Sequence, residues 1–345
     1  MLDDKNLLAQ RDPGSTRTSA VAVTTQTDFV VEVESPASPG EVANVVLAGM
    51  GGSALAADMV KVLTADRIMV PLEVVKGYQL PNFVNEKTLV IAISHSGNTE
   101  ETMSCYQQAR EHGCQLAVMA TGGKLFMAAE ADNLPRVRVP SGGQPRMSTI
   151  YHLRGLLKLL SQFEVIDDSL YHAVAASGVW LKDQLSQWAE DVPTADNYAK
   201  QLALKLVGST QVFYAGELTW PLAYKWKISF NESAKNVAFW NQYPEFSHNE
   251  FIGWSSHPVD KPYKVVDFRS SLERPRIRER MELTDRLLSG MRPKAEVVEL
   301  QGKTLLEQLL WGLALGEIVS IYAGILNGVN PEPVALVEQL KRELS

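Results

Sequence analysis

The sequence predicts an α/β protein with two tandem parallel β-sheets, each flanked by helices in a three-layer sandwich. From Val45 onward, short continuous apolar runs alternate with helical patterns, which is typical of a parallel sheet covered on both faces. The same order of strand, turn and helix returns after residue 206. A chain of 345 residues that is 45% hydrophobic is long enough for two cores of ordinary size.

The first half alternates regularly between the two kinds of element. We expect strands at 45–48, 70–75, 88–93, 115–120 and 136–139, and helices at 54–63, 99–112 and 124–131. Residues 150–206 carry apolar residues at helical spacing and predict a helical connector. The expected organisation is therefore an N-terminal lead (1–40), a first domain (41–150), the connector (151–206) and a second domain with C-terminal helices (207–345). The lead is expected to be a short helix and a flexible segment.

The second half repeats the first. The segment VFYAGELTWPLAYKWKISF resembles VVLAGMGGSALAADMVKVL, YKVVDFRSS resembles LVIAISHSG, and AEVVELQG resembles LAVMATGG. The repeat has lost the glycine-rich turn, since Glu217, Leu218 and Thr219 replace it, and DFRSS lacks the Gly-Asn-Thr of the first copy. We therefore expect a ligand anchor in the first half and catalytic groups in the second, with the site outside the carboxyl ends of the strands where the halves join.

The anchor is the segment LVIAISHSGNTEET, in which an apolar strand leads into a polar loop and a helix. Ser94, Ser96, Asn98 and Thr99 offer side-chain donors, and the peptide N–H groups of a helix that begins near Thr99 are unpaired at its positive end. No Asp or Glu, which would repel an anion, occurs between Leu89 and Thr99. The loop predicts binding of a small phosphate monoester.

A second glycine-rich turn, GMGGS, follows the strand at 45–48. Gly49, Gly51 and Gly52 permit close approach of the backbone, and Ser53 can cap the helix or bind a ligand. As a dinucleotide fingerprint the turn is partial, because the nearest ribose-binding candidate, Glu73, lies inside an apolar run. The alternative is a tight strand-to-helix turn without a ligand.

Catalytic candidates lie among the dense polar residues of KISFNESAKNVAFWNQYPEFSHNEFIGW. Glu232 is suited to act as a general base in a partly apolar cleft, and His248 to transfer protons near neutral pH. The alternative is that Glu232 pairs with Lys235 or caps a helix, and that His248 is a capping or core residue. Arg146, in SGGQPRMST, could stabilise an oxyanion, or it could be a surface arginine. Arg269 has a weaker case and is expected to support the domain junction.

Composition excludes several classes of function. The net charge is −7 without a basic block, so we expect no nucleic-acid partner. The six histidines show no HxH or HExxH spacing, so we expect no metal and no cofactor. Cys105 and Cys114 suit neither a disulfide framework nor zinc, and both are expected to be reduced and buried. The apolar stretch LLWGLALGEIVSIYAGIL is interrupted by Glu317 and predicts a buried helix; with no signal-peptide pattern, we expect a cytoplasmic protein without a membrane role.

Five segments occur in one order over nearly the whole chain from about residue 40: GMGGSA, SHSGNTEET, GGQPR, NESAK and SHNE. This order resembles the bifunctional phosphoglucose/phosphomannose isomerases of the sugar isomerase (SIS) superfamily. The SHSGNT loop alone indicates an SIS domain, whereas NESAK followed by SHNE is specific to this branch. The resemblance implies two SIS domains of flavodoxin- or Rossmann-like fold, a metal-free site between them, and a homodimer in which His248 lies near the neighbouring subunit's site.

The resemblance also implies roles for single residues. The phosphate-binding set would be Gly51, Gly52, Ser53, Ser94, Ser96 and Thr99. Glu232 would move a proton between C2 and C1 of the open-chain sugar through a cis-enediol, with Arg146 beside the enediolate and His248 opening the ring. Glucose and mannose 6-phosphates differ only at C2, so one enzyme could convert either to fructose 6-phosphate.

The chain departs from this family in one place. Val334 stands where the family has a threonine that is used near ring opening, and a valine side chain forms no hydrogen bond. His95, Trp226, Trp240 and Trp254 could narrow the sugar pocket. Two alternatives stay open: a non-catalytic SIS protein that senses a sugar phosphate, and an isomerase of another sugar phosphate, such as a pentose or heptose phosphate.

Overall fold

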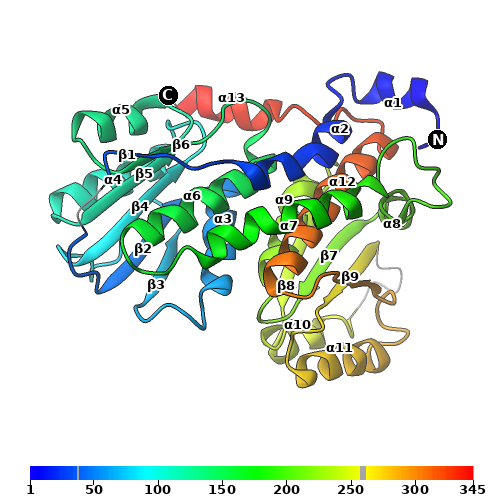
Figure 1. Cartoon of the computed structure of the whole chain (residues 1–345). Coiled ribbons are helices and arrows are strands. Elements are labelled where there is room, and N and C mark those ends of the chain that lie inside the picture. Colours follow the sequence, from blue (N-terminus) through cyan, green and yellow to red (C-terminus); the bar gives the residue numbers. More distant parts are fainter. Residues whose placement is uncertain (37–38, 257–261, 345) are drawn as a thin grey trace. The chain divides into compact units, whose positions relative to one another are not determined.

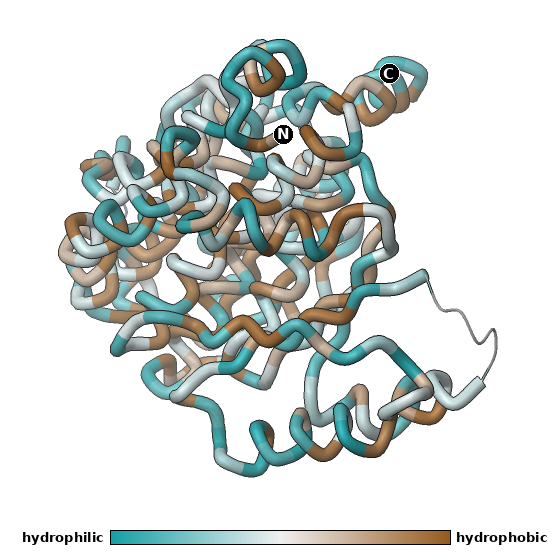
Figure 2. Tube along the Cα trace, turned by 90° about the vertical axis from the view of Figure 1, so that its right-hand side faces the viewer, coloured by the Kyte–Doolittle hydropathy of each residue, from teal (hydrophilic) through white to brown (hydrophobic). Residues whose placement is uncertain are grey.

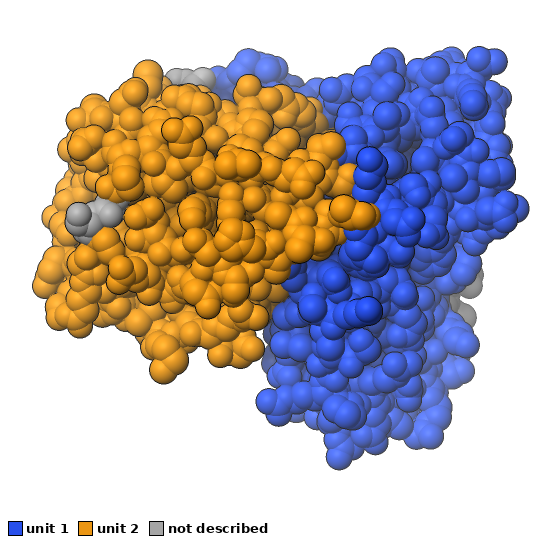
Figure 3. Space-filling model, in the orientation of Figure 1, with its two compact units in different colours: residues 1–22, 180–345 blue, residues 23–179 orange. Residues whose placement is uncertain are grey.

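The computed structural model describes residues 1–36, 39–256 and 262–344, so His257 lies outside the described residues. The chain divides into two compact units, one formed by Val23–Val179 and the other by Met1–Ala22 together with Trp180–Ser345 (Figure 3). These limits differ from the expected domain limits because the helices of the connector are shared. Helix α7 (Ser169–Ser186) runs across the limit between the units.

The unit formed by residues 23–179 contains a six-stranded sheet in the order β1-β6-β5-β4-β2-β3 (Figure 1). All neighbouring strands are parallel except β1 and β6, which are antiparallel. The strands are β1 (Val33–Glu34), β2 (Asn44–Gly49), β3 (Leu72–Val75), β4 (Thr88–Ser94), β5 (Gln115–Ala120) and β6 (Arg136–Arg138). The five strands expected in the first half are therefore confirmed, with shifts of one or two residues at their ends.

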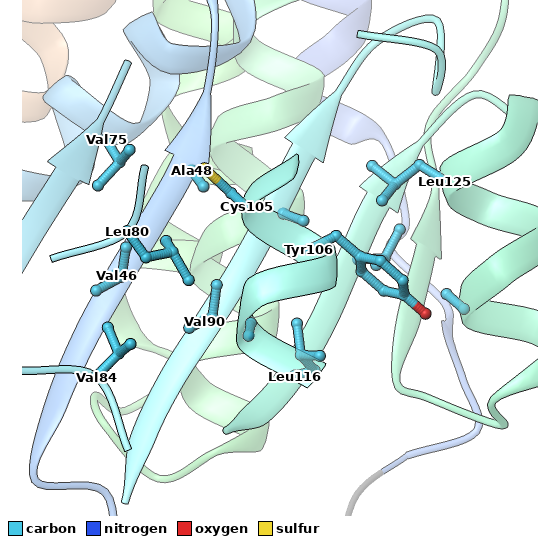
Figure 4. Packing of buried hydrophobic residues seen from close by; sticks show 14 residues of the cluster. Val46, Ala48, Val75, Leu80, Val84, Val90, Cys105, Tyr106, Leu116 and Leu125 are labelled. Atoms are coloured by element: carbon cyan, nitrogen blue, oxygen red, sulfur yellow. The ribbon is translucent and has the colours of Figure 1, made fainter. Parts of the chain in front are cut away.

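Helices cover both faces of this sheet. Helices α4 (Glu100–Glu111) and α5 (Gly123–Ala131) lie on one face, where Cys105 and Tyr106 pack on residues of β2, β4 and β5 (Figure 4). Helices α3 (Gly51–Leu63) and α6 (Thr149–Gln162) pack together on the other face. Each residue of β4 is buried, which explains why this strand is continuously apolar rather than alternating.

The N-terminal lead is more ordered than expected. It forms α1 (Lys5–Arg11), α2 (Thr16–Val21), the 3₁₀ helix η1 (Ala22–Asp28) and β1. The carboxylate of Asp12 accepts the backbone N–H groups of Thr16 and Arg17 at 2.9 and 3.0 Å and forms an ion pair with the Arg17 side chain. The prediction of a flexible segment here is therefore wrong for most of the lead, because these polar groups are buried and satisfied by local contacts.

The other unit contains a four-stranded, fully parallel sheet in the order β10-β9-β7-β8. Its strands are β7 (Thr210–Ala215), β8 (Ala238–Gln242), β9 (Tyr263–Arg269) and β10 (Glu296–Glu299). Besides α1 and α2, this unit contains the helices α8 (Tyr198–Leu206), α9 (Trp220–Glu232), the 3₁₀ helix η3 (Glu245–His248), α10 (Glu250–Gly253), α11 (Pro275–Leu287), α12 (Leu305–Leu326) and α13 (Ala335–Leu344). Helix α9 packs on β7 and β8, whereas η3, α10 and α11 close the opposite face.

The order β10-β9-β7-β8 repeats the order β5-β4-β2-β3 of the first sheet. Val45 pairs with Leu89 in the first sheet and Val212 pairs with Val265 in the second, so the structure places Val265 where the sequence match of YKVVDFRSS to LVIAISHSG placed Tyr263, a difference of two residues. The two halves are thus built alike, with β6 and β1 as additions to the first. The predicted fold class of two tandem parallel sheets flanked by helices is confirmed.

Two helices near the C-terminus differ in their surroundings. Among the described residues, α12 is the one helix long and apolar enough to cross a membrane by length and composition, and 94% of its most apolar stretch is buried inside the protein. It is therefore a core helix, as expected. Helix α13 has no buried residue, and apolar and polar residues alternate along it (Figure 2).

Candidate active site

The glycine-rich turn after β2 begins helix α3 three residues earlier than expected, at Gly51 rather than Ala54. The carbonyl oxygen of Met50 accepts the N–H groups of Ser53 and Ala54 at 3.1 and 3.3 Å, which closes the first helical turn. Gly52 lies against the backbone of Arg146, because a Cβ at Gly52 would be 3.1 Å from the Arg146 Cα atom. A side chain at Gly52 would fit only if the backbone of Pro145 and Arg146 moved. The turn thus lies beside the segment that carries Arg146.

Ser53 joins this turn to the loop after β4. Its side chain is buried, and its Oγ accepts the backbone N–H of His95 at 3.1 Å. A hydroxyl that accepts one hydrogen bond can still donate its own proton. Ser53 is therefore placed to hold the two loops together and to offer one donor to an anion.

The loop after β4 is organised by its own side chains. The Oγ atom of Ser94 lies 2.8 Å from the Oγ1 atom of Thr99, and Ser94 Oγ also accepts the Gly97 N–H at 3.1 Å. Thr99 is the N-cap residue of α4, yet its side chain makes no capping hydrogen bond to that helix. The first N–H groups of α4 consequently have no partner within the helix, which is the arrangement that attracts an anion. Ser96 is exposed at the tip of the loop.

Asn98 supports the loop through its side-chain amide. Its side-chain N–H donates to the Ser96 carbonyl oxygen at 3.1 Å, and its Oδ1 accepts the Lys124 N–H at 3.1 Å. Gly97 has a φ of +68°, and a Cβ there would overlap the carbonyl oxygen of Gly122. These contacts use one of the two side-chain N–H groups of Asn98, and the expectation that it offers a donor to a phosphate stays a prediction. Asn98 and Gly97 fix the loop against the turn after β5.

Arg146 is a buried residue and not a surface arginine. It lies in the 3₁₀ helix η2 (Pro145–Met147), its side chain is 1% exposed, and its Nη1 donates to the Gln144 Oε1 at 3.2 Å. Burial of a guanidinium is costly unless the charge meets partners of opposite polarity. Together with its position beside Gly52, this burial favours a role at the anion-binding end of the sheet.

Two histidines lie next to each other inside this unit. His95 Nδ1 is 3.4 Å from His152 Nε2, and the rings meet edge to face. Burial lowers the pKa of both, and burial together with the nearby His95 lowers the pKa of His152 to about 3. Both imidazoles are therefore neutral at pH 7. His152 was not predicted as part of the site, since nothing in its helical surroundings IYHLRG distinguished it from a structural residue.

In the second half, Glu232 is the last residue of α9 and is half-buried. The turn that follows it is held from several sides. Lys235, with a φ of +52°, donates from Nζ to the main-chain oxygens of Glu232 and Pro331. Asn327 at the end of α12 donates to the Ala234 carbonyl oxygen at 3.0 Å. These contacts fix the backbone at Glu232, as a general base requires.

His248 lies at the end of η3, and its side chain is exposed. It does not cap α10, because Asn249 does so by accepting the Glu250 N–H at 2.6 Å. Neither alternative for His248, a capping or a core residue, fits these contacts. His248 is thus available to a ligand.

Several other polar residues of the same segment serve the fold. Glu250 accepts hydrogen bonds from Tyr214 Oη and, at 2.7 Å, from Asn241 Nδ2. Asn236 Nδ2 donates to Gln211 Oε1 at 2.6 Å.

Trp226 is fully buried, donates to the Gly312 carbonyl oxygen at 2.8 Å and packs on phenylalanines. The expectation that Trp226 narrows a sugar pocket is therefore wrong, because its ring belongs to the hydrophobic core.

The cysteines and acidic residues form no metal centre in the part of the chain that the structure describes, where no three His, Cys, Asp or Glu side chains come together. Both cysteines are free, with Cys105 buried and Cys114 only half-buried. Burial raises the pKa of the Cys105 thiol to about 11, helped by the charge of Glu101. Cys105 is therefore an inert thiol at neutral pH.

The structure thus brings Gly52, Ser53, Ser94, Thr99 and Arg146 to one end of the first sheet. Two parallel sheets with the same strand order, the first with a glycine-rich turn and a serine-rich loop at the ends of two adjacent strands, are typical of the class of SIS-domain proteins. Residues 195–344 match the family described as the bacterial phospho-glucose isomerase C-terminal SIS domain.

Relatives and solved structures agree with this class. A bifunctional phosphoglucose/phosphomannose isomerase from Caldicellulosiruptor bescii is 34% identical over 88% of this chain and 90% of its own length. A D-glucosamine-6-phosphate 4-epimerase from Sulfolobus acidocaldarius is 31% identical over 63% of this chain and 66% of its own. The crystal structure of a glucose-6-phosphate isomerase like protein from Thermus thermophilus covers 100% of this chain and 99% of its own, with a TM-score of 0.67 and 18% identity. The chain belongs to the bifunctional phosphoglucose/phosphomannose isomerase family.

Proposed function

We propose that this chain is an aldose-ketose isomerase that interconverts glucose 6-phosphate and mannose 6-phosphate with fructose 6-phosphate. The observation that carries the proposal is the pair of joined turns in the first sheet. Ser53 bonds to the backbone of His95, and Ser94 bonds to Thr99 at the N-terminus of α4. The family membership adds the substrate class, because the C. bescii relative is named for both sugar phosphates.

In the proposed binding mode, Gly51, Gly52, Ser53, Ser94, Ser96 and Thr99 hold the phosphate of the sugar. Serine hydroxyls and unpaired helix N–H groups supply neutral donors, so the phosphate is bound without a lysine. This anchor fixes the register of the sugar, which places the reacting carbons at a constant distance from the phosphate. Correct placement of reacting groups can supply a large part of a rate enhancement.

The chemical step follows from three side chains. Glu232 takes the proton from C2 of the open-chain aldose and returns it to C1, while a proton moves from O2 to O1, so that the enediol becomes the ketose. Arg146 stabilises the charge that develops on the enediolate oxygen. His248 transfers the proton needed for ring opening. No step requires a metal or cofactor. Glucose 6-phosphate and mannose 6-phosphate form the same enediol intermediate, because they differ only in the configuration at C2.

The proposal has further parts. The family match to residues 195–344 supports a second SIS domain at 207–345, after a first domain at 41–150 and a connector at 151–206. We propose a cytoplasmic homodimer in which His248 lies near the neighbouring subunit's site, with a sugar phosphate as substrate and no nucleic-acid or membrane partner. The exposure of His248 supports its access to such a site.

A second candidate is an enzyme for another sugar phosphate. It is favoured by the relative named as an epimerase of glucosamine 6-phosphate, which shares about two thirds of its length with this chain. Both functions would use the same phosphate turns. A panel of hexose, amino-hexose, pentose and heptose phosphates separates them.

The experiment measures fructose 6-phosphate formation by the purified protein from each hexose 6-phosphate, with EDTA present. Glu232→Gln is the test variant, and Glu279→Gln, on the exposed surface of α11, is the control. We expect both sugars to turn over in EDTA, a loss of about 10³-fold in kcat for Glu232→Gln, and no change for the control. Full activity of Glu232→Gln would exclude the assigned base. Sugar-phosphate binding without turnover of any sugar would instead indicate a sensor.

A further inference from the structure

The second sheet retains the place where the first sheet binds an anion. Gly216 follows β7 as Gly49 ends β2, and Leu218 and Thr219 stand where the first half has Gly51 and Gly52. The N-terminus of the 13-residue helix α9 therefore corresponds to that of α3. The loop after β9 corresponds to the loop after β4 that carries Ser94 and Thr99, because β9 and β4 take the same position in their sheets.

That loop carries Glu273, whose side chain turns back onto the N-terminal end of α9. Glu273 Oε1 accepts the Leu218 backbone N–H at 2.8 Å and the Thr219 hydroxyl at 3.2 Å. The residue is 9% exposed. A carboxylate thus receives a peptide N–H and a hydroxyl at a helix start, which are the kinds of donor that the first half offers to a phosphate.

The fit around this carboxylate is tight. A Cβ at Gly216 would overlap the Glu273 carboxylate, so a side chain at this position would displace the carboxylate. The Thr219 hydroxyl also accepts the Gly216 N–H at 3.3 Å and does not cap α9. The second oxygen, Oε2, is buried and has no hydrogen-bond partner among the described residues.

We propose that Glu273 is a built-in anion that fills the duplicated phosphate site of the second half, and that its removal opens this site to a tetrahedral oxyanion such as sulfate or phosphate. The inference goes beyond the proposed function but rests on its phosphate-binding part, whereas the test below needs no catalytic activity. It explains why the repeat binds no phosphate of its own: the negative charge repels one, and the side chain takes its space. The first loop, between Leu89 and Thr99, has no acidic residue.

The test compares Glu273→Ala with Glu273→Gln. Glutamine keeps the side-chain oxygen in place without the charge, whereas alanine empties the position. Melting temperatures are measured in 0–100 mM sodium sulfate, with sodium chloride at equal ionic strength as reference. The first phosphate site is the same in both variants, so the difference between them reports the second site.

We expect sulfate to raise the melting temperature of Glu273→Ala by about 3–6 °C more than that of Glu273→Gln. A selenate soak of Glu273→Ala crystals should place an anion on the Leu218 N–H. If Glu273→Ala folds only in sulfate, that also supports the proposal, and Glu273→Ser supplies a less disruptive variant. Equal sulfate responses of Ala, Ser and Gln variants, with no selenate at Leu218, would overturn it and leave Glu273 as a simple helix cap.

Discussion

His95 Nδ1 and His152 Nε2 lie 3.4 Å apart and join the phosphate loop to helix α6. One ring nitrogen of this pair has to donate a proton while the other accepts it, so the accepting ring has to be neutral. The loop thereby depends on a residue more than 50 positions away in the chain, which the sequence pattern did not reveal.

This pair should make the protein sensitive to acid. Burial lowers the pKa of His152 from 6.5 to about 3, so between these values the unfolded chain binds a proton that the folded chain does not. Stability is therefore lost as the pH falls below 6.5, with a slope of up to about 1.4 kcal/mol per pH unit for this group. We expect urea midpoints of His152→Gln to fall less steeply between pH 6.5 and 4.5 than those of the unmodified protein. Parallel pH curves would contradict a neutral buried His152.

Gly97 should be far less replaceable than Gly113, although both have a positive φ, of 68° and 66°. A Cβ at Gly113 meets nothing within 4 Å, so Gly113→Ala should cost only the backbone strain of about 1 kcal/mol. A Cβ at Gly97 would overlap the Gly122 carbonyl oxygen, and the loop could accept alanine only by moving. We expect Gly97→Ala to lower the free energy of unfolding by more than about 3 kcal/mol.

Substrate binding distinguishes these two variants further. Gly113→Ala should leave the KM for glucose 6-phosphate unchanged, whereas folded Gly97→Ala should show a raised KM because the loop has shifted. Equal unfolding energies for the two variants would mean that the Gly97–Gly122 contact does not constrain the loop.

Ser96 is expected to act in binding more than in the chemical step. Its exposed Oγ accepts the Asn98 N–H at 3.2 Å, which leaves the hydroxyl proton free to donate to a phosphate oxygen. Loss of one hydrogen bond to a charged group corresponds to about 10- to 100-fold in affinity. Ser96→Ala should raise KM by this factor with a nearly constant kcat. The control is Ser104→Ala on α4, whose hydroxyl donates to the Tyr78 carbonyl oxygen; a change confined to kcat would place Ser96 in the chemistry instead.

The sequence predicted the strands of the first half to within two residues because their apolar runs are bounded by turns with glycine or proline. It placed the start of α3 too late, since the capping group is the main-chain oxygen of Met50 and not a side chain. Asn98 and Trp226 were given site roles by residue type alone, and only their contacts show that one supports the loop and the other the core. The burial of Arg146 could not be predicted, because a loop rich in glycine and proline has no periodic pattern that distinguishes buried from exposed positions.

Glu273 could have been found from the sequence. The absence of acidic residues from the first phosphate loop was evident, and the corresponding loop of the repeat has Glu273 three residues after its strand-end serine, Ser270. What the sequence could not supply was the direction of the side chain, which depends on the space that Gly216 leaves. The sequence thus shows which loop carries an acidic residue, whereas the contacts of that residue are known only from the structure.

Val334 offers a last prediction, because it directly precedes α13 and its carbonyl oxygen accepts the N–H groups of Val337 and Glu338 at 2.9 and 3.1 Å. This is the N-cap position, where threonine is favoured over valine by about 1 kcal/mol. Val334→Thr should therefore raise the free energy of unfolding by up to this amount, whereas Val337→Thr, inside the helix, should not. If a threonine here also assists ring opening, as the family resemblance implies, Val334→Thr should increase turnover of the cyclic sugar but not of an acyclic 6-phosphate substrate. Increased stability with unchanged turnover of both would show that Val334 affects the helix alone, and that ring opening rests on His248.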